Sequence, residues 1–190
     1  MPATDDLYLS FRLRLGSIPA GSPRIAQLMN AGTTTGNLVI TTTGRIRLRT
    51  GSTTIGLDSS PLAAGVTYRI GLHQRRGAGT NGVLEAYLAA DGSPFGAPFA
   101  SRVDGTWITP IDRLRLGATN SVVLDVTLDD VLLASGAMPS SAPIAVTGVV
   151  LVAAAPGPLD GAPRPNSITT SLSAARPALT PARWAFLCRI

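Results

Sequence analysis

Residues 7–15 read Leu-Tyr-Leu-Ser-Phe-Arg-Leu-Arg-Leu, and this stretch decides the fold class. Its large apolar side chains occupy every second residue, from Leu7 to Leu15, and mostly polar side chains fill the positions between them. Successive side chains of a β-strand point to opposite sides, so a period of two is typical of a strand with one buried face. The stretch therefore predicts a half-buried strand.

The same alternation returns along the chain, and Gly, Pro, Asn and Asp interrupt it. A Thr-rich stretch at 32–36 is interpreted as a turn, and the phase slip at Asp129-Asp130 predicts a β-bulge in the last strand. Ten short strands separated by turns are typical of a sandwich or barrel. The predicted strands are 7–15, 24–29, 37–42, 45–49, 53–57, 66–74, 83–90, 99–108, 112–116 and 122–133.

The composition indicates a folded chain with an unusual set of charges. Hydrophobic residues make up 45% and charged residues only 14% of the 190 residues, and all 16 basic residues are Arg. Two interpretations of the missing Lys stay open, namely a GC-rich coding sequence and selection for guanidinium contacts to anions. The net charge of +5 favours a polyanionic partner where arginines cluster, but no basic run of the kind that binds nucleic acid is present.

Several classes of protein are excluded. A single cysteine, Cys188, forms no internal disulfide, and one His with one Cys excludes zinc, haem and iron–sulfur centres. We expect residues 1–15 not to form a signal peptide, because Asp5 and Asp6 occupy the place of a positive segment and no apolar run follows. The most apolar segment, 144–155, is too short to span a bilayer, so we expect no membrane insertion.

The domain organisation follows from where the alternation stops. We expect one sandwich domain over residues 1–138, a Pro/Ser linker at 139–143, and an irregular C-terminal extension at 144–190. Three interpretations of this extension stay open. It forms a loosely ordered tail, an exchange or docking arm, or a truncated or frame-shifted end. One or two strands within it are a further alternative to the docking arm.

Five segments together resemble the concanavalin A-like, laminin-G-type jelly-roll superfamily over about residues 6–138. They are LSFRLRL at 9–15, RIAQL at 24–28, TTTGRIRLR at 41–49, GVTYRI at 65–70 and LDVTLDDVLL at 124–133. The resemblance implies an all-β fold of two antiparallel sheets packed face to face, with an extra C-terminal tail. It implies no single activity, because such folds host lectins, glycanases, adhesion modules and virion proteins. Similar stand-alone jelly rolls occur in tail and capsid-associated phage proteins.

The sequence lacks a recognisable catalytic set. A glycanase of this fold needs paired carboxylates, but the single glutamate, Glu85, has no carboxylate two or four residues away on its strand. Asp129 and Asp130 are adjacent and so face opposite sides of a strand. His73 is the only histidine, and no Gly-x-Ser-x-Gly elbow accompanies it. We therefore expect no enzyme and no cofactor.

Loop aspartates are the residues that a calcium site would use in this fold. Asp58, Asp91 and Asp104 lie in or near predicted loops, and carboxylate oxygens suit Ca²⁺. No Asp-x-Asp-x-Asp spacing occurs, so no metal site is predicted.

The candidate binding residues are those whose side chains the strand alternation points outward, away from the core. Outward arginines on neighbouring strands would form a ladder for an acidic glycan or an acidic protein face, or they would only keep the sheet soluble. Exposed aromatic side chains would form a platform for sugars, or they would belong to the core. The candidates are Tyr8, Arg12, Arg14, Arg45, Arg47, Arg49, Tyr87, Trp107, Arg113 and Arg115.

We therefore expect a non-enzymatic binding or assembly module, foremost a virion structural, decoration or tail-associated protein. Its partners would be other protein subunits, and its location a virion or an extracellular surface. A carbohydrate-binding module with a glycan partner is the alternative, and a glycan-active enzyme is the second alternative. No nucleic-acid partner is expected.

Overall fold

The structure is a computed structural model that describes residues 1–118 and 122–139. Every regular element in these ranges is a strand. The strands are β1 (Asp6–Leu15), β2 (Arg24–Asn30), β3 (Thr33–Ile40), β4 (Ile46–Thr50), β5 (Thr53–Ile55), β6 (Thr67–Arg75), β7 (Gly82–Ala90), β8 (Ala100–Gly105), β9 (Arg113–Leu116) and β10 (Val126–Ala134). Within these ranges the chain has no helix of the length and apolarity needed to cross a bilayer. The predicted linker from residue 140 onward and the extension at 144–190 lie outside the described residues.

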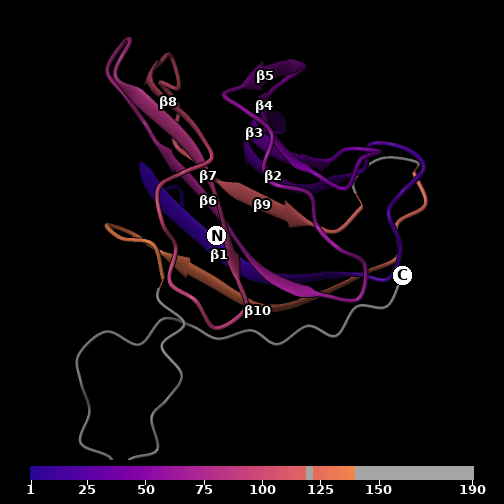
Figure 1. Cartoon of the computed structure of the whole chain (residues 1–190). Coiled ribbons are helices and arrows are strands. Elements are labelled where there is room, and N and C mark those ends of the chain that lie inside the picture. The colour runs from indigo at the N-terminus through magenta and orange to yellow at the C-terminus, as the bar shows by residue number, and fades with distance from the viewer. Residues whose placement is uncertain (119–121, 140–190) are drawn as a thin grey trace, which may run out of the picture. The chain divides into compact units, whose positions relative to one another are not determined.

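The strands form two antiparallel five-stranded sheets (Figure 1). We call β10-β1-β6-β7-β8 the first sheet and β5-β4-β3-β2-β9 the second sheet. The chain starts in the first sheet, builds β2 to β5 of the second, and returns for β6 to β8. β9 and β10 then add one edge strand to each sheet. The all-β sandwich expected from the sequence is confirmed.

The core lies between the two sheets and comes from the inward phase of each strand. Leu9, Leu13, Leu48 and Ile70 are completely buried in it, and Leu116 at the edge strand β9 packs against it partly buried. Fully burying one such side chain contributes about 1.5–3 kcal/mol. The two sheets come into contact where β5 meets β8, because the backbone of Gly56 packs closely against Ala100. A Cβ atom added to Gly56 would lie only 2.8 Å from the Ala100 Cα atom.

The predicted turn at 32–36 is wrong. β2 and β3 are joined by Ala31 and Gly32 alone, which both have positive φ (46° and 84°), so the strand already begins at Thr33. Two-residue hairpin loops take this left-handed backbone because its twist matches that of the flanking strands. From its sequence the stretch is interpreted as a turn because it is rich in Thr and has a Gly at each end, yet residues 33–36 belong to β3.

The predicted bulge at Asp129-Asp130 is confirmed. The register between β1 and β10 moves from Ser10↔Leu132 to Arg12↔Asp129, and Asp130 has a φ of 49°. The extra residue turns the Asp130 carboxylate toward β1, where it pairs with Arg12. The last strand begins at Val126, four residues later than predicted.

Candidate functional site

Five of the candidate arginines lie on the outer face of the second sheet, which we call the arginine face. Ile46 and Leu48 of β4 point into the core, so the alternation places Arg45, Arg47 and Arg49 outside. On β9, Arg113 and Arg115 are exposed by the same alternation. The outward phase predicted for these five residues is confirmed.

The register brings the two groups of arginines onto one row across the sheet. Arg115 lies opposite Gln27, Gln27 opposite Asn37, and Asn37 opposite Arg49. Three strand spacings separate Arg115 from Arg49, which puts their Cα atoms about 14 Å apart. The face therefore carries positive charge at both ends of a short polar strip.

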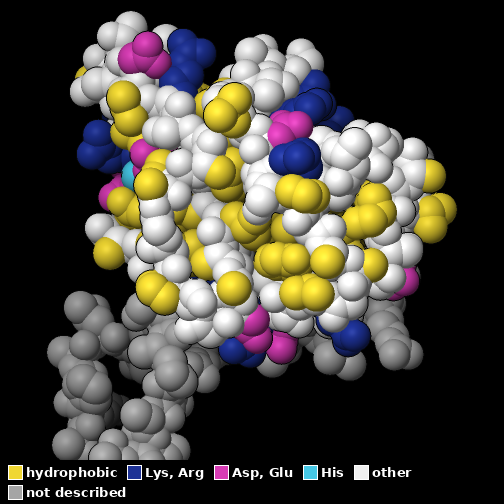
Figure 2. Space-filling view, viewed as in Figure 1, with side chains coloured by type: hydrophobic (Ala, Val, Ile, Leu, Met, Phe, Trp, Pro, Cys, Tyr) yellow, Lys and Arg dark blue, Asp and Glu magenta, His cyan; other side chains and the backbone are white. Residues whose placement is uncertain are grey.

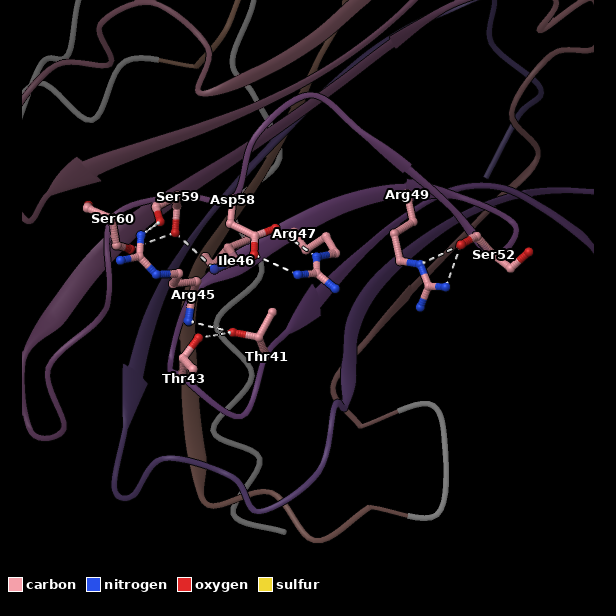
Figure 3. Close-up of polar contacts among 10 residues, drawn as sticks. All are labelled: Thr41, Thr43, Arg45, Ile46, Arg47, Arg49, Ser52, Asp58, Ser59 and Ser60. Carbon is pink, nitrogen blue, oxygen red and sulfur yellow. Dashed lines mark hydrogen bonds and ion pairs between the residues drawn. The ribbon is translucent and has the colours of Figure 1, made fainter.

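The arginines at β4 are held by two segments that follow it, the turn before β5 and the loop after β5 (Figure 3). Arg47 forms two hydrogen bonds to the Asp58 carboxylate, Nε to Oδ1 and Nη2 to Oδ2, both 2.7 Å long. This bidentate pairing lowers the pKa of Asp58 and raises that of Arg47. Arg45 donates to the Ser59 carbonyl (2.7 Å), and Arg49 donates to the Ser52 carbonyl. Among these three arginines, only Arg47 therefore pairs with a carboxylate of the described residues.

The two arginines of β9 have no such restraint. Among the described residues, Arg113 and Arg115 make no hydrogen bond or ion pair, and both are exposed. Their guanidinium groups present their donors to solvent. A partner can bind these two groups without first breaking a contact within the described part of the chain. Binding to them therefore carries the smallest free-energy cost among the arginines of this face.

The middle of the row is made of two carboxamides. Gln27 and Asn37 are only 3% and 2% exposed. Their amide groups donate to Thr34 Oγ1 (3.1 Å) and to the Gly51 carbonyl (3.4 Å). Both carbonyl oxygens are buried without a hydrogen-bond donor from the described residues. Unpaired buried acceptors of this kind are rare in folded proteins.

The expected ladder of arginines does not form across all of the candidate strands. Arg12 and Arg14 belong to β1, and β1 lies in the first sheet, so they face away from the arginine face. Strand alternation is local, but sheet membership depends on long-range pairing. This part of the hypothesis is corrected.

The outer face of the first sheet holds a histidine network. The His73 ring nitrogens lie 2.9 Å from Asp6 Oδ1 and 3.0 Å from Glu85 Oε2, and the ring stacks on Tyr8 with centroids 3.8 Å apart. His73 is 4% exposed. The sequence alone does not indicate this network, because the approach of His73 to Asp6 and Glu85 depends on the β1-β6-β7 order.

Glu85 is the centre of this network. Its carboxylate accepts hydrogen bonds from the Tyr87 hydroxyl (2.7 Å) and the Ser101 hydroxyl (3.0 Å) besides the contact with His73. Burial alone would raise the pKa of Glu85, but these hydrogen bonds outweigh it and lower the pKa. Burial and the bond to Glu85 raise the pKa of Tyr87 strongly, so this phenol stays neutral.

Arg69 occupies the centre of the same face and is 2% exposed. It donates to the Ser93 and Pro139 carbonyls (2.9 and 3.0 Å) and lies 4.4 Å from the centre of the Phe95 ring. Next to it, Gly71 leaves room for Met138, since a Cβ there would lie 2.9 Å from the Met138 methyl carbon. Residues 93–95 and 138–139 thus cover this part of the sheet.

Arg12 and Arg14 lie nearer the β10 side of the first sheet. Arg12 pairs with Asp91 (2.9 Å) and Asp130 (3.0 Å), and Arg14 donates to the Gly65 carbonyl (2.8 Å). Arg12 is therefore balanced by two carboxylates. Arg14 is exposed and has no carboxylate partner among the described residues.

Trp107 is not an exposed platform, and this candidate is corrected. Its side chain belongs to the core cluster, the residue is 8% exposed, and its indole N–H donates to the Thr35 carbonyl (3.0 Å). A buried indole needs such an acceptor. Tyr8 and Tyr87 are half-buried, and their rings stack on His73 and meet the edge of Phe95.

The loop aspartates considered for calcium lie beside arginines. Asp58 pairs with Arg47, Asp91 with Arg12, and Asp104 with Arg102. The described part of the chain contains no group of three His, Cys, Asp or Glu side chains arranged to hold a metal ion. Figure 2 likewise shows arginine side chains beside acidic ones at several places on the viewed face.

A comparison with protein families finds no match, and a comparison with curated proteins finds none. Among solved structures, the chain is similar to the endo-β-1,4-glucuronan lyase of the fungus Trichoderma reesei. The TM-score is 0.53 at 14% identity, over 69% of this chain and 68% of that one. It is also similar to the native heptameric SAP-like pentraxin of Limulus polyphemus, with a TM-score of 0.44 at 13% identity, over 70% of this chain and 65% of that one. Identities this low show the fold alone, and the described part of the chain has the fold of a two-sheet antiparallel jelly-roll sandwich.

Proposed function

We propose that this chain is a non-enzymatic binding module that takes an acidic glycan on its arginine face. The observation that carries this proposal is the pair of exposed guanidinium groups of Arg113 and Arg115, which make no hydrogen bond or ion pair among the described residues. They share their face with Arg45, Arg47 and Arg49, of which only Arg47 pairs with a carboxylate in the contacts described. A guanidinium fork matches a carboxylate or sulfate group in geometry and charge. The face thus attracts anions and can orient them.

A glycan suits the middle of this face better than other polyanions. The buried carbonyl oxygens of Gln27 and Asn37 lack donors, and sugar hydroxyls supply donors. No aromatic ring of the row offers a stacking surface for nucleotide bases. The similar fungal protein is a lyase of an acidic glycan by name, but that likeness supports the fold only.

The non-enzymatic part of the proposal is supported by the state of the groups that could act as acid or base. His73 contacts a carboxylate through each ring nitrogen and is buried, and Glu85 accepts from three side chains. The raised pKa of Tyr87 keeps its proton in place. These three groups stabilise one another, and none of the three is exposed as a base for a substrate.

The test is affinity electrophoresis through gels that contain pectate, alginate or neutral dextran. We expect retardation by the acidic polymers only, weakening as salt is added. The variant Arg113→Gln/Arg115→Gln should lose about tenfold or more in affinity, since each charged hydrogen bond is worth about 1.5–3 kcal/mol. Equal retardation by dextran would refute the proposal.

The matched control is Arg76→Gln/Arg102→Gln, which removes the same charge from two exposed ion pairs elsewhere on the molecule. This control should bind as the unaltered protein does. If both double variants lost affinity equally, net charge and not the arginine face would be responsible, and the proposal would fail.

Assembly with further subunits, as in a virion, is the second candidate function. It is favoured by apolar side chains at the edge where β5 approaches β8, where Leu57 and Val103 are 77% and 62% exposed. Exposed apolar groups beside edge strands promote pairing with a second copy. Native mass spectrometry should then show an oligomer that Leu57→Ser/Val103→Ser dissociates. A strict monomer would remove this candidate.

A further inference from the structure

A separate cavity of about 180 Å³ lies over β1 on the outer face of the first sheet. Arg14 forms its centre, and the register places Thr127 of β10 and Thr67 of β6 directly opposite Arg14 on either side. Asp129 and Asp91 complete the polar lining, together with Arg12. At about 30 Å³ per water molecule, the cavity has room for about six waters, which is the scale of one sugar ring.

The cavity offers one cation flanked by two hydroxyl groups. Arg14 uses its Nε to donate to the Gly65 carbonyl, so its two terminal nitrogens stay available. Neither Thr67 nor Thr127 makes a side-chain hydrogen bond within the described part of the chain. A carboxylate placed on Arg14 would therefore receive a guanidinium fork and a hydroxyl donor from each side.

The carboxylates of the lining restrict what else the ligand can carry. Asp91 is already paired with Arg12, and Asp129 uses one oxygen to accept the Asp130 N–H (2.7 Å). The second oxygen of Asp129 is an acceptor for ligand hydroxyl groups. The same negative charges disfavour a doubly charged anion such as a phosphate. A fitting ligand has one negative charge and several hydroxyl donors.

We propose that this cavity binds a single uronic-acid sugar, with the sugar carboxylate on Arg14 and the sugar hydroxyls on Asp129. The site lies on the first sheet and is independent of the arginine face on the second. Glucuronate binding in this cavity therefore does not require that Arg113 and Arg115 bind a polymer.

The test is an NMR titration of the full chain with glucuronate, glucose and inorganic phosphate at millimolar concentrations. Glucuronate should shift the amide signals of Arg14, Thr67 and Thr127, and the other two compounds should bind at least about tenfold more weakly. The variant Arg14→Gln should weaken glucuronate binding about tenfold, and Thr127→Val, which keeps the side-chain shape, should weaken it severalfold.

Arg102→Gln serves as the control, because Arg102 lies in an exposed ion pair with Asp104 outside this cavity and its replacement should leave the glucuronate affinity unchanged. Absent shifts at Arg14 and its neighbours, or equal binding of glucose or phosphate, would overturn this proposal. Neither result would bear on polymer retardation through Arg113 and Arg115, so the two proposals fail separately.

Discussion

Replacing Glu85 with Ala should destabilise the protein far more than its place on a sheet surface suggests. The carboxylate accepts from His73, Tyr87 and Ser101 at 2.7–3.0 Å, and its side chain is only 16% exposed. His73 and Tyr87 would keep their polar atoms in a buried or half-buried place without this acceptor. A buried polar group that loses its hydrogen-bond partner costs about 1–3 kcal/mol. Two such groups give an expected loss of about 3 kcal/mol in the free energy of unfolding.

The pH dependence of this loss has a definite sign. The pKa of Glu85 is lowered in the folded protein, so its charged form stabilises the fold fully above the unfolded pKa of about 4.3. This contribution disappears as the pH falls through the lower folded pKa. The difference between the unaltered protein and Glu85→Gln, which stays neutral, should therefore be larger at neutral pH than in strong acid.

Urea unfolding followed by circular dichroism measures both effects, provided that the transition is two-state. Asp104→Ala is the control, because Asp104 is a carboxylate with a side chain that is 76% exposed and should contribute about 1 kcal/mol or less. A loss below about 1 kcal/mol for Glu85→Ala, or a difference for Glu85→Gln that does not change with pH, would refute the argument that this network is buried and cooperative.

Three further predictions concern packing and backbone, and urea midpoints check each of them. Gly71→Val should cost about 1–3 kcal/mol by pressing on Met138, and Met138→Ala should restore part of that loss; equal losses with either residue at 138 would contradict the contact. Ala31→Gly should stabilise by about 1 kcal/mol, because Ala31 has a φ of 46°, and a destabilised variant would argue against the two-residue turn. Leu13→Ala should cost about 2–5 kcal/mol, whereas a loss under about 1 kcal/mol would place Leu13 outside the core.

The candidate site was predictable in part. The outward phase of Arg47, Arg49, Arg113 and Arg115 follows from the apolar residues between them, and the structure agrees. The sequence could not tell which arginines lie on one face, because Arg12 alternates in the same way yet belongs to the other sheet. The sequence also could not tell which arginines lack hydrogen bonds and ion pairs to the described residues.

The sequence alone determined most of the strands and the bulge at Asp129-Asp130, because a period of two is a local property of neighbouring residues. It did not determine where β3 and β10 begin. Only the tertiary structure decided which faces meet. His73 contacts Asp6, 67 positions away, and Trp107 reaches the Thr35 carbonyl, 72 positions away, through strand pairings that no local pattern encodes. The physical reason is that strand order depends on the total burial that a whole arrangement achieves, whereas alternation needs only one strand and one apolar layer.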